Sequence, residues 1–466
     1  MHNPHVRYLC FPSVVCTGKE TEIWIKPRDL SRVFRKDAGY SLAVVGQYED
    51  SADYKTPIPL DHDFEIKDGC LVFRHTFDRE QLYSIRFRQE AQSEIRLELY
   101  AVDADLYALR PLKGDLHSHS FCSDGVDGAA MTPADYREEG YDFFALTDHN
   151  RMYPSVFANA LYDGIKLGMH ILPGEEMHTP GSMVHLVHVG GKKSVCDQYI
   201  HDREGYEAAV DAIAETLPQI DPQYRRRVAM AKWACRQAHE AGGIVIFAHP
   251  CWIPNQYNLS PELLDLIYDN KMLDAFELMG GIPDRDTNLQ LALWQEKALS
   301  GNYLPPVGSS DTHNHSRKEA GGFTHRFTVV FARENSTEAI LDAIKSGYTL
   351  AADRTDDGIA HFYGSLRLVM FARFLYANYF NETWQICHGE GNLMRRYARG
   401  EDVGQTLSSL ADSVENFYKE FYGITPPTGI PQARLDFQEA LRNAHLNGPL
   451  TKGSHLFVYG KNTRND

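Results

Sequence analysis

Five short apolar runs in this chain are each followed at once by histidine or acidic side chains, and this repeated arrangement constrains the fold more than any other feature. Continuous apolar runs of about four residues, separated by helical segments, indicate buried parallel strands. In a barrel-like α/β protein the carboxyl ends of such strands gather at one end, so the residues that follow them meet there. The polar clusters are Thr147–Asn150, Pro173–Glu176, Val184–His188, Phe247–Pro250 and Gly308–His313.

His117 and His119 stand two residues apart, behind a further short strand-like segment. Residues i and i+2 of a strand face the same way, so both imidazoles can meet one metal ion. A lone histidine at such a place is more often a hydrogen-bonded core residue. The recurrence at several strand ends reverses that preference and predicts a metal centre.

These motifs, in this order, resemble the PHP (polymerase and histidinol phosphatase) family of metal-dependent phosphoesterases over residues 114 to about 358. The resemblance implies a distorted (β/α)7, TIM-like barrel that binds two or three divalent ions in a cleft at one end. It implies that the first ion is surrounded by His117, His119, Glu176 and Asp311. Glu176 would bridge to a second ion held by His249 and by His185 or His188, and a third would be held by Asp124, His149 and His313.

Two of these assignments have alternatives. Glu175 and Glu176 are adjacent and face opposite sides of a strand, and the family pattern Pro-Gly-any-Glu favours Glu176. His185 and His188 also face opposite sides, with a slight preference for His188. Asp124 takes a place where many relatives carry histidine, which makes the third site richer in oxygen.

The residue types suit hydrolysis by a metal-activated water. A divalent ion lowers the pKa of bound water from 15.7 toward about 7, and two ions about 3.5–4 Å apart can clamp the attacking and leaving oxygens. Imidazole and carboxylate together suit zinc, manganese or iron. The expected reaction is hydrolysis of a phosphate mono- or diester; a carboxylic ester or carbamate hydrolase and a non-catalytic metal-binding scaffold are the alternatives.

Positive charge for a phosphate ester is expected from arginines near the clusters. Arg354 ranks first because it follows the apolar run that looks like the last strand of the barrel, and Arg151 and Arg317, the latter beside Lys318, are the others. Asp115 and Asp148 are expected either to accept a histidine ring N–H or to be solvated or capping carboxylates. Glu277, at another strand end, resembles a supporting acidic residue of the family.

The chain is expected to form three parts. Alternating runs in residues 1–110 predict an antiparallel β-sandwich, residues 111–358 the barrel, and residues 359–466 a helical C-terminal extension. A helical insertion at 202–241 is expected to serve as a lid or wall of the cleft.

Composition limits the partners. Lys and Arg number 47 against 63 Asp and Glu, a net charge of −16, which argues against a large nucleic-acid partner and leaves a small-molecule phosphate ester. The eight cysteines are scattered, without a CxxC pair, which is typical of reduced thiols. With no recognisable signal peptide or membrane segment, a cytoplasmic protein is expected, with homo-oligomers formed through the flanking domains.

Overall fold

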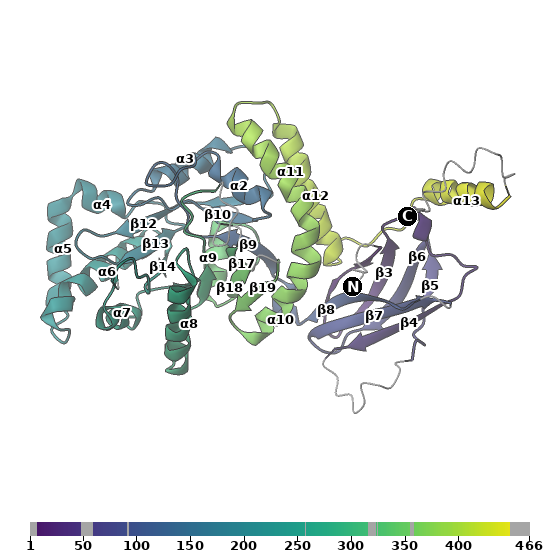
Figure 1. Cartoon of the computed structure of the whole chain (residues 1–466), viewed down its shortest axis with the longest axis horizontal. Helices are drawn as coiled ribbons and strands as arrows, with labels where there is room; N and C mark the ends of the chain where they lie inside the picture. The colour runs from purple at the N-terminus through teal and green to yellow at the C-terminus, as the bar shows by residue number, and fades with distance from the viewer. Residues whose placement is uncertain are drawn as a thin grey trace, which may run out of the picture. The chain divides into compact units, whose positions relative to one another are not determined.

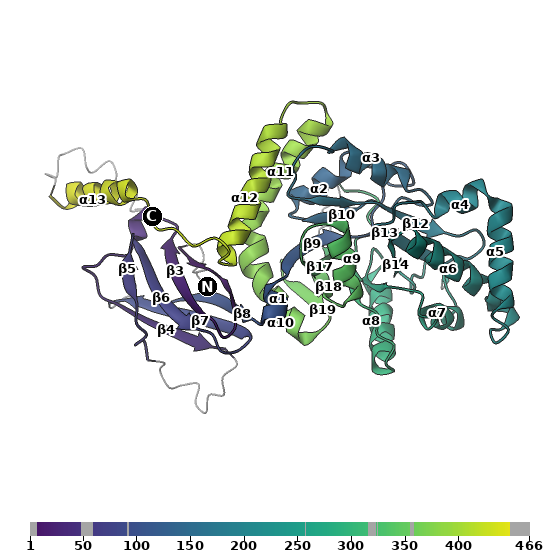
Figure 2. The same cartoon turned by 180° about the vertical axis from the view of Figure 1, so that it is seen from behind.

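The structure is a computed structural model that describes residues 7–47, 59–90, 93–256, 258–315, 323, 325–354 and 358–447, with the side chains of 445–447 left aside. The chain divides into two compact units (Figures 1 and 2). One comprises Met1–Asp103 together with Glu420–Asp466, and the other comprises Ala104–Lys419. The three-part division expected from the sequence stays a prediction.

Two four-stranded sheets make up most of the first unit, in the orders β1-β3-β6-β5 and β2-β8-β7-β4. Alternate residues of both sheets, among them Ile23, Ile25, Ile85 and Leu97, are buried in one shared core. All pairings are antiparallel except that of β2 with β8, which is parallel and departs from the wholly antiparallel sandwich expected. The strands are β1 (Tyr8–Phe11), β2 (Val14–Cys16), β3 (Glu20–Pro27), β4 (Tyr40–Gly46), β5 (Glu65–Lys67), β6 (Cys70–Thr76), β7 (Gln81–Gln89) and β8 (Ile95–Val102).

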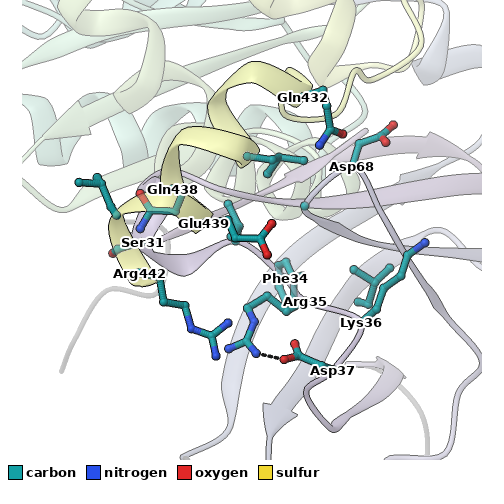
Figure 3. A pocket seen from close by; sticks show the side chains of 15 residues that line it. Ser31, Phe34, Arg35, Lys36, Asp37, Asp68, Gln432, Gln438, Glu439 and Arg442 are labelled. Atoms are coloured by element: carbon teal, nitrogen blue, oxygen red, sulfur yellow. Dashed lines mark hydrogen bonds and ion pairs between the residues drawn. The ribbon is translucent and has the colours of Figure 1, made fainter. Parts of the chain in front are cut away.

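A cavity of about 890 Å³ in this unit lies between the short helix η2 (Leu30–Arg32), the turn at Gly69 and helix α13 (Gln432–Asn447) (Figure 3). Gly69 has a φ of +74°, and a Cβ there would lie 2.7 Å from Leu435 Cδ2, so the turn needs glycine. Arg35 and Asp37 form an ion pair on its wall. Both basic and acidic side chains line this cavity.

The second unit contains a six-stranded sheet, β11-β10-β9-β17-β18-β19, and a five-stranded sheet, β12-β13-β14-β15-β16. Its helices connect and cover these strands (Figure 1). The strands are β9 (Arg110–Asp115), β10 (Phe143–Ala145), β11 (His170–Leu172), β12 (Gly174–His178), β13 (His185–Val189), β14 (Ile244–Phe247), β15 (Ala275–Met279), β16 (Pro306–Gly308), β17 (Arg326–Ala332), β18 (Thr349–Arg354) and β19 (Ala360–Tyr363). The helices are α1 (Ala104–Tyr107), α2 (Thr132–Glu138), α3 (Tyr153–Leu161), α4 (Cys196–His201), α5 (Arg203–Glu215), α6 (Pro222–Glu240), α7 (Pro261–Tyr268), α8 (Asp284–Leu299), α9 (Thr337–Lys345), α10 (Leu366–Leu375), the π-helix η3 (Tyr376–Phe380), α11 (Asn381–Ala398) and α12 (Gly404–Phe421), which runs on into the first unit.

The α/β class expected from the sequence is confirmed, but the paired strands do not form one closed barrel. β17 pairs antiparallel with β9, so the first sheet continues through β18 and β19 instead of closing on the second. Two isolated bridges, Ser118–Thr312 and His149–Glu176, link the sheets beyond their regular ladders. Both bridges involve residues of the clusters that follow the strands.

One of the five apolar runs was expected to be a parallel strand that ends at the His185 cluster. This expectation is wrong, because the strand begins there and runs the other way. β13 begins at His185 and runs antiparallel to both β12 and β14. Only residues 179–184 separate β12 from β13, and so short a connection can form a hairpin but not the crossover that parallel strands need. The other pairs among the cluster-bearing strands, such as β9 with β10 and β14 with β15, are parallel as expected.

The helical insertion at 202–241 forms α5 and α6, separated near Pro218 and Pro222. Asp221 accepts a hydrogen bond from the Gln223 backbone N–H, and Pro222 takes the first turn, where its missing N–H costs nothing. One face of α6, which includes Val228, Trp233 and Ala238, is buried in the core of the second unit. α6 is therefore part of the packed wall and not a lid.

All eight cysteines lie in the described part of the chain, and each is a free thiol. Over the same residues, the helices are either too short or too polar to cross a membrane.

Candidate metal centre

His117 and His119 lie in the segment that continues β9, and both are fully buried. The backbone ties this segment to the residues after β16, because Asp311 N–H donates to the His117 carbonyl and His119 N–H to the Thr312 carbonyl, each at 2.9 Å. The two Nε2 atoms are 3.3 Å apart, and they lie 3.3 and 3.0 Å from Asp311 Oδ1. Both imidazoles therefore face one point, and their binding of one metal ion stays a prediction.

Glu176 lies at the middle of the cluster, fully buried, and each of its two oxygens faces three imidazoles. Around Oε2 are His149 Nδ1 at 2.6 Å, His117 Nε2 at 3.3 Å and His119 Nε2 at 3.4 Å. Around Oε1 are His185 Nδ1 at 3.0 Å, His178 Nε2 at 3.2 Å and His249 Nε2 at 3.3 Å. Asp311 spans the same two groups, since its Oδ2 lies 3.8 Å from His249 Nε2.

These close approaches are not aligned as hydrogen bonds. Both oxygens of Glu176, His149 Nδ1, His178 Nε2 and His185 Nδ1 are buried and lack a hydrogen-bond partner. A buried polar atom left without a partner costs free energy, and such groups in native proteins usually coordinate something. Nitrogen and oxygen lone pairs that converge without sharing protons are the arrangement that a cation stabilises.

The charges of the centre favour a positive species among the imidazoles. Burial works against the charged form of His117, yet the carboxylates of Asp311, Glu277 and Glu176 raise its pKa well above the usual value. Burial would raise the pKa of Glu176, but the surrounding imidazoles, led by His117, hold it well below its usual range. Glu176 is thus a carboxylate throughout the ordinary pH range, which is the form that binds metal ions.

The pairing of β12 with β13 decides between the two candidate histidines. Glu176 pairs with Val187, and His178 with His185, so Glu176, His178 and His185 share one face of the hairpin. Glu175 pairs with His188 on the other face, where His188 Nδ1 lies 3.0 Å from Glu175 Oε1. The structure therefore brings His185 to the centre and places His188 away from it, against the slight preference drawn from the sequence.

The two histidines should respond differently to substitution. His185→Ala is expected to lower the metal content of the purified chain and leave its thermal unfolding midpoint in metal-free buffer unchanged. His188→Ala is expected to keep the metal and lower the free energy of unfolding by about 1–3 kcal/mol, because Glu175 loses a buried hydrogen-bond partner. Metal analysis and denaturant titration of both variants measure this, and metal loss in His188→Ala alone would contradict the assignment.

Asp124, His149 and His313 meet at a more open place beside His119. His149 Nε2 and His313 Nε2 lie 3.3 and 3.2 Å from the two oxygens of Asp124, and the His119 ring stacks on that of His313 with centroids 4.2 Å apart. The Asp124 side chain is 56% exposed, whereas Glu176 is not exposed at all. This group is brought together as expected, at the solvent side of the cluster.

Acidic residues around the centre hold its histidines and loops. Glu277 Oε2 accepts a hydrogen bond from His117 Nδ1 at 2.8 Å, as expected of a supporting carboxylate. Asp115 accepts from the backbone N–H groups of His117 and Ser310, and burial raises its pKa to about 7. Asp148 accepts from the backbone and hydroxyl of Ser120. Of the two roles considered for Asp115 and Asp148, the structure shows backbone and hydroxyl capping.

The three arginines expected to bind substrate have different places. Arg151 lies near the centre, where its guanidinium donates to the backbone carbonyls of His149, at 3.1 Å, and of Cys122. Arg354 lies at the end of β18, beside Tyr376, whose pKa burial raises although the Arg354 guanidinium works against that rise. Its backbone N–H donates to the His325 carbonyl, and among the described contacts none joins its side chain to the histidines of the centre. Arg317 lies outside the described residues.

Comparison with known proteins gives matches among solved structures alone. No family model matches the chain, and no curated protein matches it. A two-domain protein from Bacteroides vulgatus, described as containing a predicted PHP-like metal-dependent phosphoesterase, is 22% identical over 52% of this chain and 65% of its own, with a TM-score of 0.36. This chain thus spans about two thirds of that protein's length.

Two further solved structures resemble the chain at a similar level. A protein from Bifidobacterium adolescentis described as a metal-dependent phosphoesterase is 19% identical over 44% of this chain and 89% of its own, with a TM-score of 0.32. The lesion-specific endonuclease of Pyrococcus furiosus is 13% identical over 68% and 91%, with a TM-score of 0.34.

Proposed function

We propose that this chain is a metal-dependent hydrolase of phosphate esters of the PHP type. The observation that carries the proposal is the surroundings of Glu176, a buried carboxylate whose oxygens each face three imidazole nitrogens without hydrogen-bond alignment. A core built for stability alone would pair these atoms through protons. A carboxylate shared between two groups of nitrogens fits a bridging ligand between two cations.

The residues present fit such ions in number and in chemistry. His117, His119, Asp311 and Glu176 Oε2 would hold the first, and Glu176 Oε1 with His185 and His249 would hold the second. Asp124, His149 and His313 offer a third position, with the ring of His119 beside them. Mixed imidazole and carboxylate ligation suits zinc, manganese or iron. Bound there, divalent ions supply a water of lowered pKa and positive charge for the leaving oxygen.

The protein's own groups prepare this site. A proton on His117 Nδ1, donated to Glu277, leaves the Nε2 lone pair directed at the centre. The ring of Trp252 lies 5.8 Å from that of His249 and 6.3 Å from that of His185, and so borders the centre on this side. Arg151, beside His149, is the arginine that we assign to the substrate phosphate.

The proposal includes the distorted barrel of seven strands. Following the ladders from β12 to β16, then the bridge Ser118–Thr312 to β9 and β10, and then the bridge His149–Glu176 back to β12, gives a ring of seven strands. Because both bridges lie among the cluster residues, such a ring would close at the metal centre itself. A small phosphate ester, rather than a long nucleic acid, suits the net charge of −16.

Turnover of two chromogenic esters tests this function. The full chain, loaded with manganese or zinc, is expected to hydrolyse p-nitrophenyl phosphate or bis-p-nitrophenyl phosphate. The double variant His117→Ala, His119→Ala is expected to lose at least about 10³-fold in kcat/KM. His201→Ala, at the exposed end of α4, is the matched control and should retain wild-type activity. Equal activity in the double variant and the wild type would refute the hydrolase; metal binding without turnover would favour the scaffold.

A further inference from the structure

His178 is a metal-competent residue that the motifs do not include. It is the last residue of β12, two positions after Glu176, and therefore faces the same side of the strand. Its ring stacks on that of His185, with centroids 3.6 Å apart and planes 26° from parallel. The side chain is 28% exposed, so the ring lies at the boundary between the buried centre and solvent.

The ring nitrogen of His178 that faces the centre has no proton partner. Nε2 is buried, lies 3.2 Å from Glu176 Oε1 and makes no hydrogen bond. His149 Nδ1 is in the same condition, 2.6 Å from Glu176 Oε2. The rings of His149 and His178 are 4.4 Å apart, and the three ligand atoms lie within 4.8 Å of one another.

We propose that His178 is a metal ligand and that, together with Glu176 and His149, it forms a binding position for a divalent cation. This position differs from the one that Asp124 and His313 border, because it uses the other nitrogen of His149. The inference rests on the proposed function, since both need Glu176 to bind cations.

His149 borders both positions, but its ring can bind a cation in only one of them at a time. A neutral imidazole has one lone pair, so it can coordinate through Nδ1 or through Nε2 but not through both. When Nδ1 binds beside His178, the Nε2–H is left to donate to Asp124 Oδ2, 3.3 Å away. Asp124 then orients His149, which is the role of a carboxylate behind a metal-bound histidine.

The competing role for His178 is to support His185 by stacking. His178→Phe separates the two roles, because phenylalanine keeps a flat ring against His185 and removes the ligand atom. His178→Ala removes both. His201→Ala controls for the loss of an exposed histidine.

The test measures metal content and affinity, not turnover. Each full-length variant is stripped, equilibrated with manganese or zinc against a competing chelator, and analysed for metal per chain, with the unfolding midpoint recorded in metal-free buffer. We expect His178→Phe and His178→Ala alike to bind one equivalent at least about 10-fold more weakly than wild type, because His149 is then left to the position that Asp124 and His313 border, with unchanged midpoints.

Combination with a second variant tests whether the two positions are distinct. His313→Ala is expected to weaken only the position that Asp124 and His313 border. The double variant His178→Phe, His313→Ala should therefore lose more metal than either single variant. Wild-type metal content and affinity in His178→Phe would overturn the inference and leave the proposed function standing. Failure of the wild-type chain to take up either metal would overturn both.

Discussion

Glu176→Gln is expected to remove metal binding and to lower kcat/KM for phosphate esters at least about 10³-fold, while the chain stays folded. The amide cannot bridge two cations as a carboxylate does, and its NH2 group would point at imidazole nitrogens that serve as ligands. All six surrounding nitrogens lie within 3.4 Å of this one side chain, so Glu176 touches more of the centre's histidines than any other residue that the structure describes.

Glu175→Gln is the matched control, because it makes the same chemical change one residue earlier on the opposite face of β12. Glu175 accepts from Ser194 Oγ and the Val195 N–H, both at 2.6 Å, and from His188. We expect Glu175→Gln to retain metal and activity while losing about 1–3 kcal/mol of stability. Metal analysis, steady-state kinetics and denaturant titration of the pair measure this. Metal retention in Glu176→Gln would refute the bridging role.

Glu390→Ala is expected to lower the free energy of unfolding by about 3–5 kcal/mol, because it leaves the Arg137 guanidinium buried without its main counter-ion. Neither side chain of the pair is exposed, and Arg137 Nε donates to Glu390 Oε2 at 2.8 Å. Glu390 also accepts from the Gly168 N–H at 2.6 Å. At Gly391 a Cβ would lie 2.4 Å from the Glu138 backbone nitrogen, so α11 and α2 are in close contact here.

Chemical denaturation followed by tryptophan fluorescence checks this, with Lys166→Ala as the control. Lys166 pairs with Asp412, but both side chains are 57% exposed, so its loss should cost less than about 1 kcal/mol. The double variant Arg137→Met, Glu390→Leu should cost much less than Glu390→Ala, because no charge is then left buried. A cost in Glu390→Ala as small as that in Lys166→Ala would contradict a structural role for this pair.

Most of the chemistry of the centre could be predicted without coordinates. The i, i+2 spacing of His117 and His119, the carboxylate after Pro173-Gly174, and the pair Asp311 and His313 each combine metal-competent side chains with a strand end. Alternation along a strand is a local property, so a single segment is enough to show which neighbours share a face. His178 was missed although it has the same two-residue spacing from Glu176, a signal that could have found it.

Relations between segments could not be predicted in this way. In the hairpin of β12 and β13, Glu176 and His185 share one face, and Glu175 and His188 share the other. The sequence allows either pair to be the ligands, and only the pairing register shows which pair lies at the centre. Arg354 looked suitable by its position after an apolar run, but the pairing of β18 with β17 and β19 carries it to Tyr376.

The sequence by itself determined which chemical groups this protein assembles and which of them share a strand face, because side-chain alternation depends only on the local backbone. The tertiary structure decided which faces meet. Strand register, the direction of β13 and the approach of α11 to α2 arise from hydrogen bonds and packing between residues far apart in the chain. A single segment of sequence therefore does not reveal them.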